Sequence, residues 1–362
     1  MQLILRMAEA DRDPRYLDAA RRSVDFVLAS QYDNGGWPQR WPVQKPFNHH
    51  GHADYTGYIT FNDEVACKNI EFLQLAYRLL GDERIPNSIA RAMQVHVATQ
   101  QPAPQAGWAM QHTLDMKPAA ARTYEPLALT THTTADNVRA LMAFYRETGD
   151  RRFLARIPEA LDWLESVRLP ADQVKNGRAF PTYVEIGSNR PLYVHRRGSN
   201  VVNGEYYSDY DPGNVIGHYG QTRAINLQKL RDEYTALAAL DPAQVKRDSA
   251  LESATRGPLP RYFMQRIGEV SDLNLSANGK TPAELVASLN ADGYWPTPLV
   301  ATSHPYHGDG AATPPAGDFR TTRVGDDSDT SPFIADTPVI GISTGTYIEH
   351  MSRLIEALRV AE

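Results

Sequence analysis

Two tryptophans stand close together in a loop of unusual composition. The stretch NGGWPQRWP, residues 34–42, places Trp37 and Trp41 among glycines and prolines, directly after an amphipathic helical pattern over residues 16–30. Aromatic rings offer large flat apolar faces, and a sugar ring stacks on such a face. The other interpretation is that the two rings pack the loop over a core. The sequence leaves both interpretations open.

Polar residues that suit acid–base and carboxylate chemistry gather in four further segments. They are Asp63 and Glu64 in ITFNDE, Gln111 and His112 in MQHT, Arg122, Tyr124 and Glu125 in ARTYEP, and Tyr183, Arg190, His195, Arg196 and Arg197 in TYVEIGSNRPLYVHRR. Arginine pairs bidentately with carboxylates, and carboxylates hold hard cations. Two structural roles stay open: Asp63 as a helix cap, and Arg122 with Glu125 as an internal ion pair that supports a loop.

Two more clusters are weaker candidates for a cation site. His49, His50 and His52 lie near Asp54, but no H-x-x-x-H spacing puts two of them on one helix face. A histidine that acts on substrate is favoured over a metal site there. Asp326, Asp327 and Asp329 lie in an acidic stretch that lacks the other elements of an EF-hand loop. We interpret that stretch as a loop over the mouth of the site, with Arg320 or Arg323 reaching substrate.

The first half of the chain contains an internal repeat that must position these residues. Three segments each begin with an acidic turn, continue as an amphipathic helix and end in a glycine-aromatic loop. The turns start at Asp13, Asp82 and Asp150, and the loops hold Gly36-Trp37, Gly107-Trp108 and the looser Gly177 to Phe180. The companion helices are expected over residues 64–80 and 134–148, with Asp63 and Thr133 as cap-like residues.

A helix-pair repeat of about 70 residues is longer than a tetratricopeptide unit and fits an α/α toroid. In a toroid the glycine-aromatic loops recur at one end of the ring and line a single cavity. The alternative is an irregular all-α bundle with coincidental spacing. We therefore predict a mainly α fold, an (α/α)3-like toroid with long irregular loops and a small β-hairpin region.

The chain after residue 170 is richer in glycine, proline and asparagine. Helices are expected over residues 225–240, 281–290 and 346–360, and a β-hairpin over residues 179–196 with its turn at GSNR. We predict one domain over residues 1–362: helix-pair repeats over 1–170, a loop-rich part that forms a cleft over 171–340, and a C-terminal helix over 341–362.

Composition excludes several classes of protein. The net charge is −6 with no basic patch, so nucleic acid is not an expected partner. Cys67 is the one cysteine and rules out a disulfide framework. No apolar stretch approaches the length of a membrane span. No signal peptide is visible, but the opening MQLILRMAEA resembles the middle of a helix, so we expect that earlier sequence is missing.

The motifs NGGWPQ, YITFNDEV, GWAMQH, ARTYEP and EIGSNRP occur in an order and spacing that resemble polysaccharide lyase family 10, the pectic acid lyases, over about residues 10–200. The closing ISTGTYIEHMSRLIEAL is similar to the terminal helix of that family. The resemblance implies an (α/α)3 toroid that cleaves polygalacturonate by calcium-assisted β-elimination. It also implies that Asp63 and Glu64 take part in calcium binding.

The sequence departs from the family pattern at two places. Thr113 stands where a family aspartate is expected, and Asp115, a different spacing away, is the nearest substitute for calcium. Thr182 stands where the family has its catalytic arginine, and threonine does not serve as that base. Either another group has taken over, or the activity has changed or been lost. A tyrosine or histidine base beside an arginine suits a lyase that needs no calcium.

We predict a lyase that cleaves a uronic-acid polysaccharide. The candidate catalytic residues are Tyr183, Arg190, His195 and Arg196, the candidate substrate-binding residues are Trp37, Trp41, Gln111, His112, Arg122, Tyr124 and Glu125, and the candidate metal ligands are Asp63 and Glu64. The alternatives are a glycoside hydrolase with Asp63 and Glu125 as its carboxylate pair, and a non-catalytic sugar-binding relative. An acidic saccharide is the expected partner of a monomer, and the resemblance implies a secreted or periplasmic protein.

Overall fold

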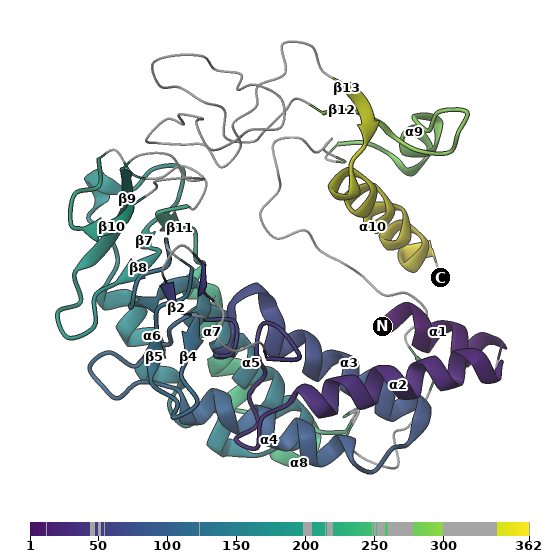
Figure 1. The fold of residues 1–362 in the computed structure, drawn as a ribbon, viewed down its shortest axis with the longest axis horizontal. Helices are drawn as coiled ribbons and strands as arrows, with labels where there is room; N and C mark the ends of the chain where they lie inside the picture. The colour runs from purple at the N-terminus through teal and green to yellow at the C-terminus, as the bar shows by residue number, and fades with distance from the viewer. Residues whose placement is uncertain are drawn as a thin grey trace. The chain divides into compact units, whose positions relative to one another are not determined.

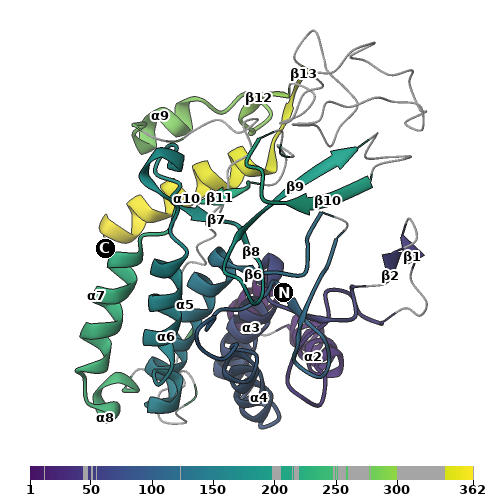
Figure 2. The same ribbon diagram turned by 90° about the vertical axis from the view of Figure 1, so that its left-hand side faces the viewer.

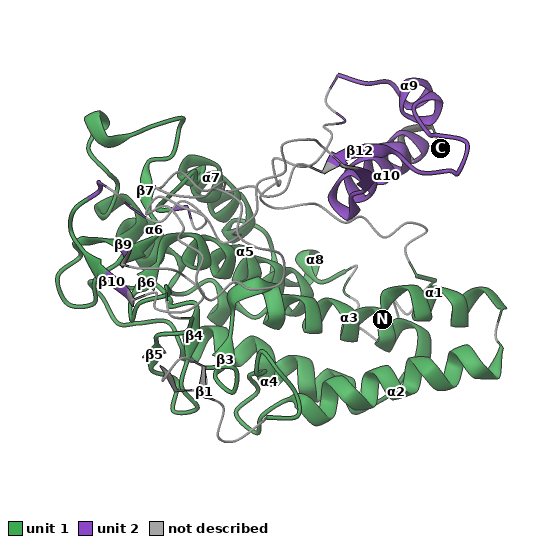
Figure 3. Cartoon of the chain, turned by 45° about the horizontal axis from the view of Figure 1, so that its top comes forward, with its two compact units in different colours: residues 1–194, 208–211, 221–259 green, residues 195–207, 212–220, 260–362 purple. Residues whose placement is uncertain are grey.

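The computed structural model describes residues 1–11, 13–43, 48–49, 52–53, 55–122, 124–197, 205–213, 215, 220–247, 249, 251, 258–259, 277, 279–299 and 339–361. The chain divides into two compact units, drawn in two colours in Figure 3. Unit 1 holds residues 1–194, 208–211 and 221–259, and unit 2 holds residues 195–207, 212–220 and 260–362. The predicted single domain stays a prediction, and His50, Asp54, Arg320, Arg323 and the acidic stretch with Asp326, Asp327 and Asp329 lie outside the described residues.

Unit 1 is built from paired helices, as the repeat predicted (Figure 1). The helices are α1 Gln2–Asp11, α2 Pro14–Ser30, α3 Val65–Leu80, α4 Ile85–Ala98, α5 Thr131–Thr148, α6 Ile157–Ser166, α7 Leu227–Ala238 and α8 Pro242–Val245. Sequential helices pack against each other, and α3 also packs on α1 while α5 packs on α4. Figure 2 shows α5, α6 and α7 running side by side. The mainly α character of the fold is thus confirmed.

The three acidic turns share one local structure. A carboxylate oxygen of Asp13, Asp82 and Asp150 accepts a hydrogen bond from the backbone N–H two residues later, at 2.8, 3.0 and 2.9 Å. The residue two positions on is an arginine in each case, and its guanidinium also binds the aspartate. The side chain caps α2 after Asp13 and the short 3-10 helix Arg151–Phe153 after Asp150. The spacing in the sequence therefore reflects a true structural repeat.

A buried tryptophan follows α2, and another follows α4. The indole Nε1–H of Trp37 donates to the carbonyl of Val27 on α2 at 2.9 Å, and that of Trp108 donates to the carbonyl of His96 on α4 at 2.9 Å. The preceding glycines let the chain approach its neighbours, because a Cβ on Gly36 would lie 2.7 Å from Ile59. Each tryptophan therefore fixes the chain against the helix that precedes it.

The same tryptophans pair with the strand that leads into the next helix. The carbonyl of Trp37 accepts from the N–H of Thr60 at 3.0 Å, and the carbonyl of Trp108 accepts from the N–H of Thr130 at 2.8 Å. Thr60 ends β3 Ile59–Thr60 before α3, and Thr130 ends β6 Leu129–Thr130 before α5. We call the end of such a strand, together with the residues that follow it up to the start or the first turn of the next helix, a junction. The first junction is residues 60–64 and the second is residues 130–133.

The third pair follows the same plan through a small sheet. Phe180 in β7 Phe180–Pro181 pairs with Arg223 in β11 Thr222–Arg223, which leads into α7 through a third junction, residues 222–226. Beside it β8 Tyr183–Val184 pairs antiparallel with β9 Pro191–Arg197, so the predicted hairpin and its turn are confirmed. β10 Glu205–Asp209 and β6 complete a sheet in the order β10-β9-β8-β6. Shorter strands are β1 Asn48–His49, β2 His52–Ala53, β4 Gln111–His112 and β5 Pro118–Ala119.

Unit 2 contains a further copy of this plan, which the sequence analysis missed. It consists of α9 Pro282–Ala287, β12 Pro296–Leu299, β13 Val339–Ile342 and α10 Thr344–Ala361. The indole Nε1–H of Trp295 donates to the carbonyl of Leu285 on α9 at 2.8 Å, ten residues back, as Trp37 does to Val27. The ring of His350 on α10 meets Trp295 edge-on at 4.9 Å. The motif DGYW, residues 292–295, is the signal that was overlooked, because its repeat partner is separated from it by a long insertion.

Two buried histidines predict that the fold loses stability in mild acid. His96 and His112 are both 0% exposed and contact Phe61, with ring centroids 4.9 and 5.4 Å apart. Burial lowers the pKa of His96 to about 4 and that of His112 to about 3. Unfolded histidines bind protons below about pH 6.5. The contribution of the two buried histidines to the free energy of unfolding is therefore fully present above that pH, and the free energy of unfolding falls as the pH drops toward the folded pKa values.

The expected loss is at most about 1.4 kcal/mol per pH unit for each histidine. Urea unfolding at a series of pH values measures it, with His112→Phe as the comparison. That variant keeps an aromatic ring beside Phe61 and removes one titrating group, so its stability should fall less steeply with pH. Equal slopes for both proteins would show that His112 does not titrate on unfolding.

Candidate active site

The first junction is strained where it carries its carboxylates. Asp63 has φ 54° and ψ 24°, and Glu64 has φ 57° and ψ 21°. This left-handed conformation costs about 1–2 kcal/mol for a residue with a Cβ. Neither side chain caps α3, so the helix-cap interpretation of Asp63 is wrong. Strained backbone of this kind concentrates at functional sites, because the surrounding structure must hold it in place.

The first junction is longer than the second. The chain covers 21 positions from Thr60 to Gly81, the left-handed cap of α3, but 19 from Thr130 to Gly149, the equivalent cap of α5. The second junction runs directly into α5, which begins at Thr131, so the expected cap at Thr133 lies inside the helix. Because α3 has 16 residues and α5 has 18, the two extra positions of the first pair lie before the helix, and we call them the insertion of the first junction.

An arginine between two carboxylates holds the insertion in place. One nitrogen of Arg122 donates to Asp63 Oδ2 at 2.8 Å and another donates to Glu125 Oε1 at 2.8 Å. Glu125 is 2% exposed and also accepts from the Arg122 N–H and from Asn62 Nδ2. Gln39 Nε2 adds a bond to the same Asp63 oxygen at 3.0 Å. The predicted alternative of an internal Arg122–Glu125 pair is thus confirmed.

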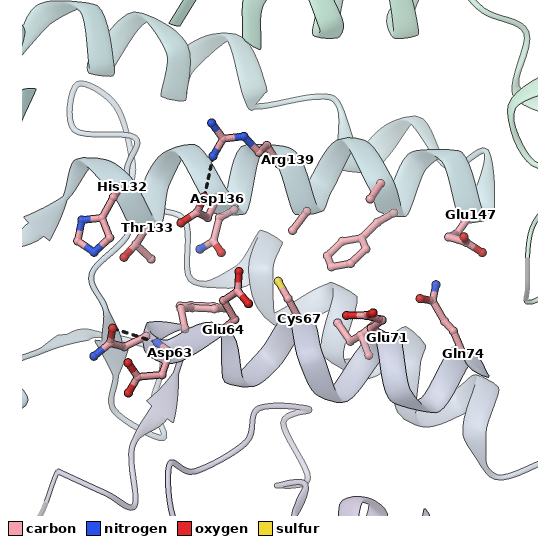
Figure 4. A pocket seen from close by; sticks show the side chains of 17 residues that line it. Asp63, Glu64, Cys67, Glu71, Gln74, His132, Thr133, Asp136, Arg139 and Glu147 are labelled. Carbon is pink, nitrogen blue, oxygen red and sulfur yellow. Dashed lines mark hydrogen bonds and ion pairs between the residues drawn. The ribbon is translucent and has the colours of Figure 1, made fainter. Parts of the chain in front are cut away.

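A pocket of about 540 Å³ lies between α3 and α5 beside the first junction. Figure 4 shows Asp63 and Glu64 at the same end of the pocket as His132 and Thr133, with side chains from the two helices facing each other. Its floor is apolar, with Phe61, Ile70 and Phe144 among the lining residues. Cys67 faces the pocket, and burial raises the pKa of its thiol to about 12, so the thiol stays protonated. The pocket brings the first and second junctions together.

The charges in the pocket are arranged around His132 and Asp136. Burial, and then the positive charge of Arg223, lowers the pKa of His132 to about 3, so the imidazole is neutral near pH 7. Its Nδ1 has no hydrogen-bond partner among the described residues. The Asp136 side chain is 62% exposed and pairs with Arg139 at 2.6 Å. His132 was not among the predicted site residues, because one histidine in THTTAD gives no sequence signal.

Arg223 is a second residue that the sequence analysis missed. It lies in the third junction, and its Nε donates to Thr182 Oγ1 at 3.2 Å. Thr182 is 0% exposed, its N–H donates to the carbonyl of Gln221 at 2.8 Å, and its carbonyl accepts from the N–H of Thr131 at 3.3 Å. Thr182 stands where the family pattern has an arginine, and it contacts Arg223, an arginine on the neighbouring strand β11. That contact was not visible in the sequence because 41 positions separate the two residues.

Three predicted sugar contacts are corrected by burial. Trp37 is 1% exposed, while Gln111 and His112 are both 0% exposed. Trp37 is held by Val27 as described above, and Gln111 Nε2 donates to Thr60 Oγ1 at 3.3 Å. Gln111 and His112 form β4, the central strand of the sheet β3-β4-β5, and their burial together with that of Trp37 makes them packing residues. Trp41 is 40% exposed and remains available for stacking.

None of the predicted catalytic residues of the hairpin is among the described residues that line the pocket. Tyr183 is 0% exposed, and its hydroxyl donates to the carbonyl of half-buried Tyr124 at 3.4 Å. His195 is 4% exposed and stacks on Tyr207 at 5.1 Å. Arg190 is exposed, with its guanidinium 3.3 Å from the ring centre of Tyr210. Arg196 lies in β9, where the structure describes its backbone. Their catalytic roles stay predictions.

Two carboxylates named earlier are already engaged. Glu125 is buried and bound by Arg122 and Asn62, so it is a poor acid or base for the hydrolase alternative, which needs two open carboxylates across a cleft. Asp115 binds Thr113 and Lys117, and the Lys117 bond is the main reason that the pKa of Asp115 is lowered to about 2. These contacts leave Asp63 and Glu64 as the accessible acids of the first junction.

The comparison with family models decides what kind of protein this is. The model of the pectic acid lyases matches residues 1–206, more than half of the chain. The chain belongs to the pectic acid lyase family. The predicted resemblance is confirmed, and so is the predicted class of enzyme, a polysaccharide lyase. A comparison with curated proteins gives no match.

Solved structures of lyases are similar to this pectic acid lyase. The family 10 polysaccharide lyase from Cellvibrio cellulosa is 16% identical with a TM-score of 0.50, over 66% of this chain and 77% of that chain. A variant of the family 10 lyase from Cellvibrio cellulosa in complex with trigalacturonic acid is 15% identical with a TM-score of 0.48, over 65% and 76%. At 16% identity, the similarity to the family 10 lyase shows that the two proteins share a fold and nothing further.

The residues of this pectic acid lyase fit a calcium ion in part. Asp63 Oδ1 has no partner among the described residues, and the Glu64 side chain is 72% exposed with Lys68 3.7 Å away. Carboxylate oxygens are the ligands that calcium prefers, but it takes six to eight of them. The described part of the chain has no group of three or more His, Cys, Asp or Glu placed to hold a metal ion. The two carboxylates fit a cation that draws its other ligands from water or substrate.

The strain at Glu64 gives a prediction about stability in this pectic acid lyase. Glu64→Gly and Glu64→Ala both remove the carboxylate, but alanine keeps the Cβ that the left-handed conformation disfavours. Glycine should therefore be more stable than alanine by about 1 kcal/mol, the reverse of their order inside a helix. Thermal unfolding of the two variants measures the difference. Alanine equal to or more stable than glycine would show that the junction is not strained in solution.

Proposed function

We propose that this pectic acid lyase cleaves a pectate-like polyuronide by β-elimination at the end of the α3–α5 pocket. The proposal rests on one observation above all. The residues matched by the family model place the strained Asp63–Glu64 pair beside neutral His132 in one pocket. An acidic saccharide is the proposed substrate, and we place the enzyme outside the cell or in the periplasm. No helix among the described residues is long and apolar enough to cross a membrane.

The reaction needs three events at one sugar. A base takes the C5 proton, the electrons of that bond form the C4=C5 double bond, and the C4–O bond breaks with its electron pair on the leaving oxygen, which takes a proton. His132 suits the first event, because its imidazole is neutral at pH 7 and its Nδ1 is unpaired among the described residues. Burial is the main cause of its pKa of about 3 and the charge of Arg223 the second, so His132 is a weak base whose pKa a bound carboxylate would raise by offsetting that second cause.

Calcium is proposed as a partner of the Asp63–Glu64 pair. The two carboxylates would contribute oxygen ligands, while Arg122 and Gln39 hold the second oxygen of Asp63 and so fix its orientation. A bound calcium ion would neutralise the uronate carboxylate and make the C5 proton more acidic. Five carboxylates line the same pocket: Asp63, Glu64, Glu71, Asp136 and Glu147. Without a cation they repel a polyanion, which is the physical reason to expect one.

The (α/α)3 toroid is proposed as the complete fold. The supporting observation is that α9, Trp295 and α10 repeat the plan of α2, Trp37 and α3, down to the same indole-to-carbonyl bond. A ring of such pairs would put every junction at one end. The long loops expected between residues 171 and 340 would then surround that end.

An ultraviolet assay for unsaturated uronides tests the proposed function. We expect wild-type protein to produce them from polygalacturonate, and a chelator to abolish the signal. Asp63→Asn should reduce kcat/KM at least about 100-fold, because one oxygen of a positioned carboxylate becomes an amide. Asp25→Asn, on the exposed face of α2 and paired with Arg84, is the matched control. No product from any uronide would contradict the lyase, and a signal that ignores chelator would contradict calcium.

Small-angle X-ray scattering tests the toroid. A compact chain of this length should have a radius of gyration of about 21 Å. A clearly larger value, or a scattering profile of two separated bodies, would contradict a closed ring. The monomer is tested in the same measurement, because the forward scattering reports molecular mass.

A further inference from the structure

We propose that Arg223 pairs with the uronate carboxylate of the substrate, and so supplies the guanidinium that position 182 lacks in this chain. The proposal rests on the lyase activity proposed above. It assigns a substrate-binding residue that neither the motifs nor the family match points to, since Arg223 lies after residue 206, where the match ends.

The place of Arg223 in the repeat supports this role. Arg223 pairs with Phe180 as Thr60 pairs with Trp37 and as Thr130 pairs with Trp108. It therefore belongs to the third junction, while Asp63 belongs to the first and His132 to the second. Each junction brings a different chemical group: a carboxylate pair, an imidazole and a guanidinium. These three groups are what an elimination at a uronide requires.

The contacts of Thr182 hold the arginine in place. The buried Thr182 hydroxyl accepts from Arg223 Nε at 3.2 Å, and its N–H donates to the carbonyl of Gln221 on the same neighbouring strand at 2.8 Å. The Thr182 carbonyl also accepts from the N–H of Thr131, the residue before His132, at 3.3 Å. A threonine at position 182 is therefore connected to both the second and the third junctions. It acts as a positioning residue for Arg223.

Arg223 lies in the third junction and is not one of the residues that line the α3–α5 pocket. It is connected to the second junction through Thr182 and Thr131, and its charge contributes to the lowered pKa of His132, which lines the pocket on α5. Arg139 is bound to Asp136 at 2.6 Å, so it is less available to a ligand. A guanidinium binds a carboxylate through two parallel hydrogen bonds and stabilises the negative charge that builds up on that carboxylate as the C5 proton leaves.

Arg223→Ala is the first test, on full-length protein with polygalacturonate. We expect kcat/KM to fall at least about 100-fold while the melting temperature changes little. Arg223→Lys should keep part of the activity, because lysine keeps the positive charge but loses the two parallel N–H donors of the guanidinium. Added guanidinium, at millimolar concentrations that do not unfold the protein, should restore part of the activity of Arg223→Ala. The matched control is Arg231→Ala, a half-buried arginine on α7 that pairs with Asp162 on α6.

Thr182→Val is the second test, because valine keeps the size of threonine and removes the acceptor for Arg223 Nε. We expect a smaller loss than for Arg223→Ala, mostly in kcat. Activity of Arg223→Ala equal to wild type, or a loss that guanidinium does not rescue, would overturn the proposal while leaving the lyase intact. Calorimetric titration with trigalacturonate distinguishes failure of the Arg223 proposal from failure of the proposed lyase activity. Binding by wild type and not by Arg223→Ala supports the proposal even without turnover, and equal binding by both overturns it.

Discussion

The bond from a buried indole to a helix carbonyl is the interaction on which the rest of this structure depends. An indole N–H in a dry core must find an acceptor, and Trp37, Trp108 and Trp295 find it on the helix just completed. The backbones of Trp37 and Trp108 pair with the strand that leads into the next helix. After Trp295 the next residue begins β12, which pairs with β13 before α10. One residue thus sets the distance between one helix and the start of the next. Truncation of such a side chain typically costs about 3–5 kcal/mol.

Because the junctions are fixed in this way, their side chains can be strained, charged and partly exposed without loss of the fold. The first junction holds two acids in a left-handed conformation, and Arg122 between Asp63 and Glu125 offsets the repulsion that this creates. The second presents an uncharged imidazole. The third presents a guanidinium on a buried threonine. The carboxylates of the first junction and the imidazole of the second line one pocket, and Arg223 of the third junction is connected to the second through Thr182. The apolar floor of the pocket strengthens electrostatic interactions there.

The repeat and the hairpin could be predicted from the sequence because they depend on local patterns: helical periodicity, an aspartate before each turn, and a turn at GSNR. The repeat unit around Trp295 could not, because a long insertion separates its two halves. Burial of Trp37 and His112 was equally hidden, since a loop tryptophan has the same sequence signal whether it faces sugar or core. Asp63 and Glu64 were found through motif resemblance. Arg223 was not, because the pairing of β7 with β11 is a long-range contact that no spacing reveals.

The two-residue insertion at Asp63 and Glu64 separates catalysis from architecture. The pair α4 and α5 keeps the same plan without such an insertion, because α5 begins at Thr131, directly after β6. A shorter junction, like the one before α5, would keep the helices and the indole anchors and lose the two acids. The proposed metal ligands of this enzyme therefore lie on chain length that the helix-pair architecture does not need.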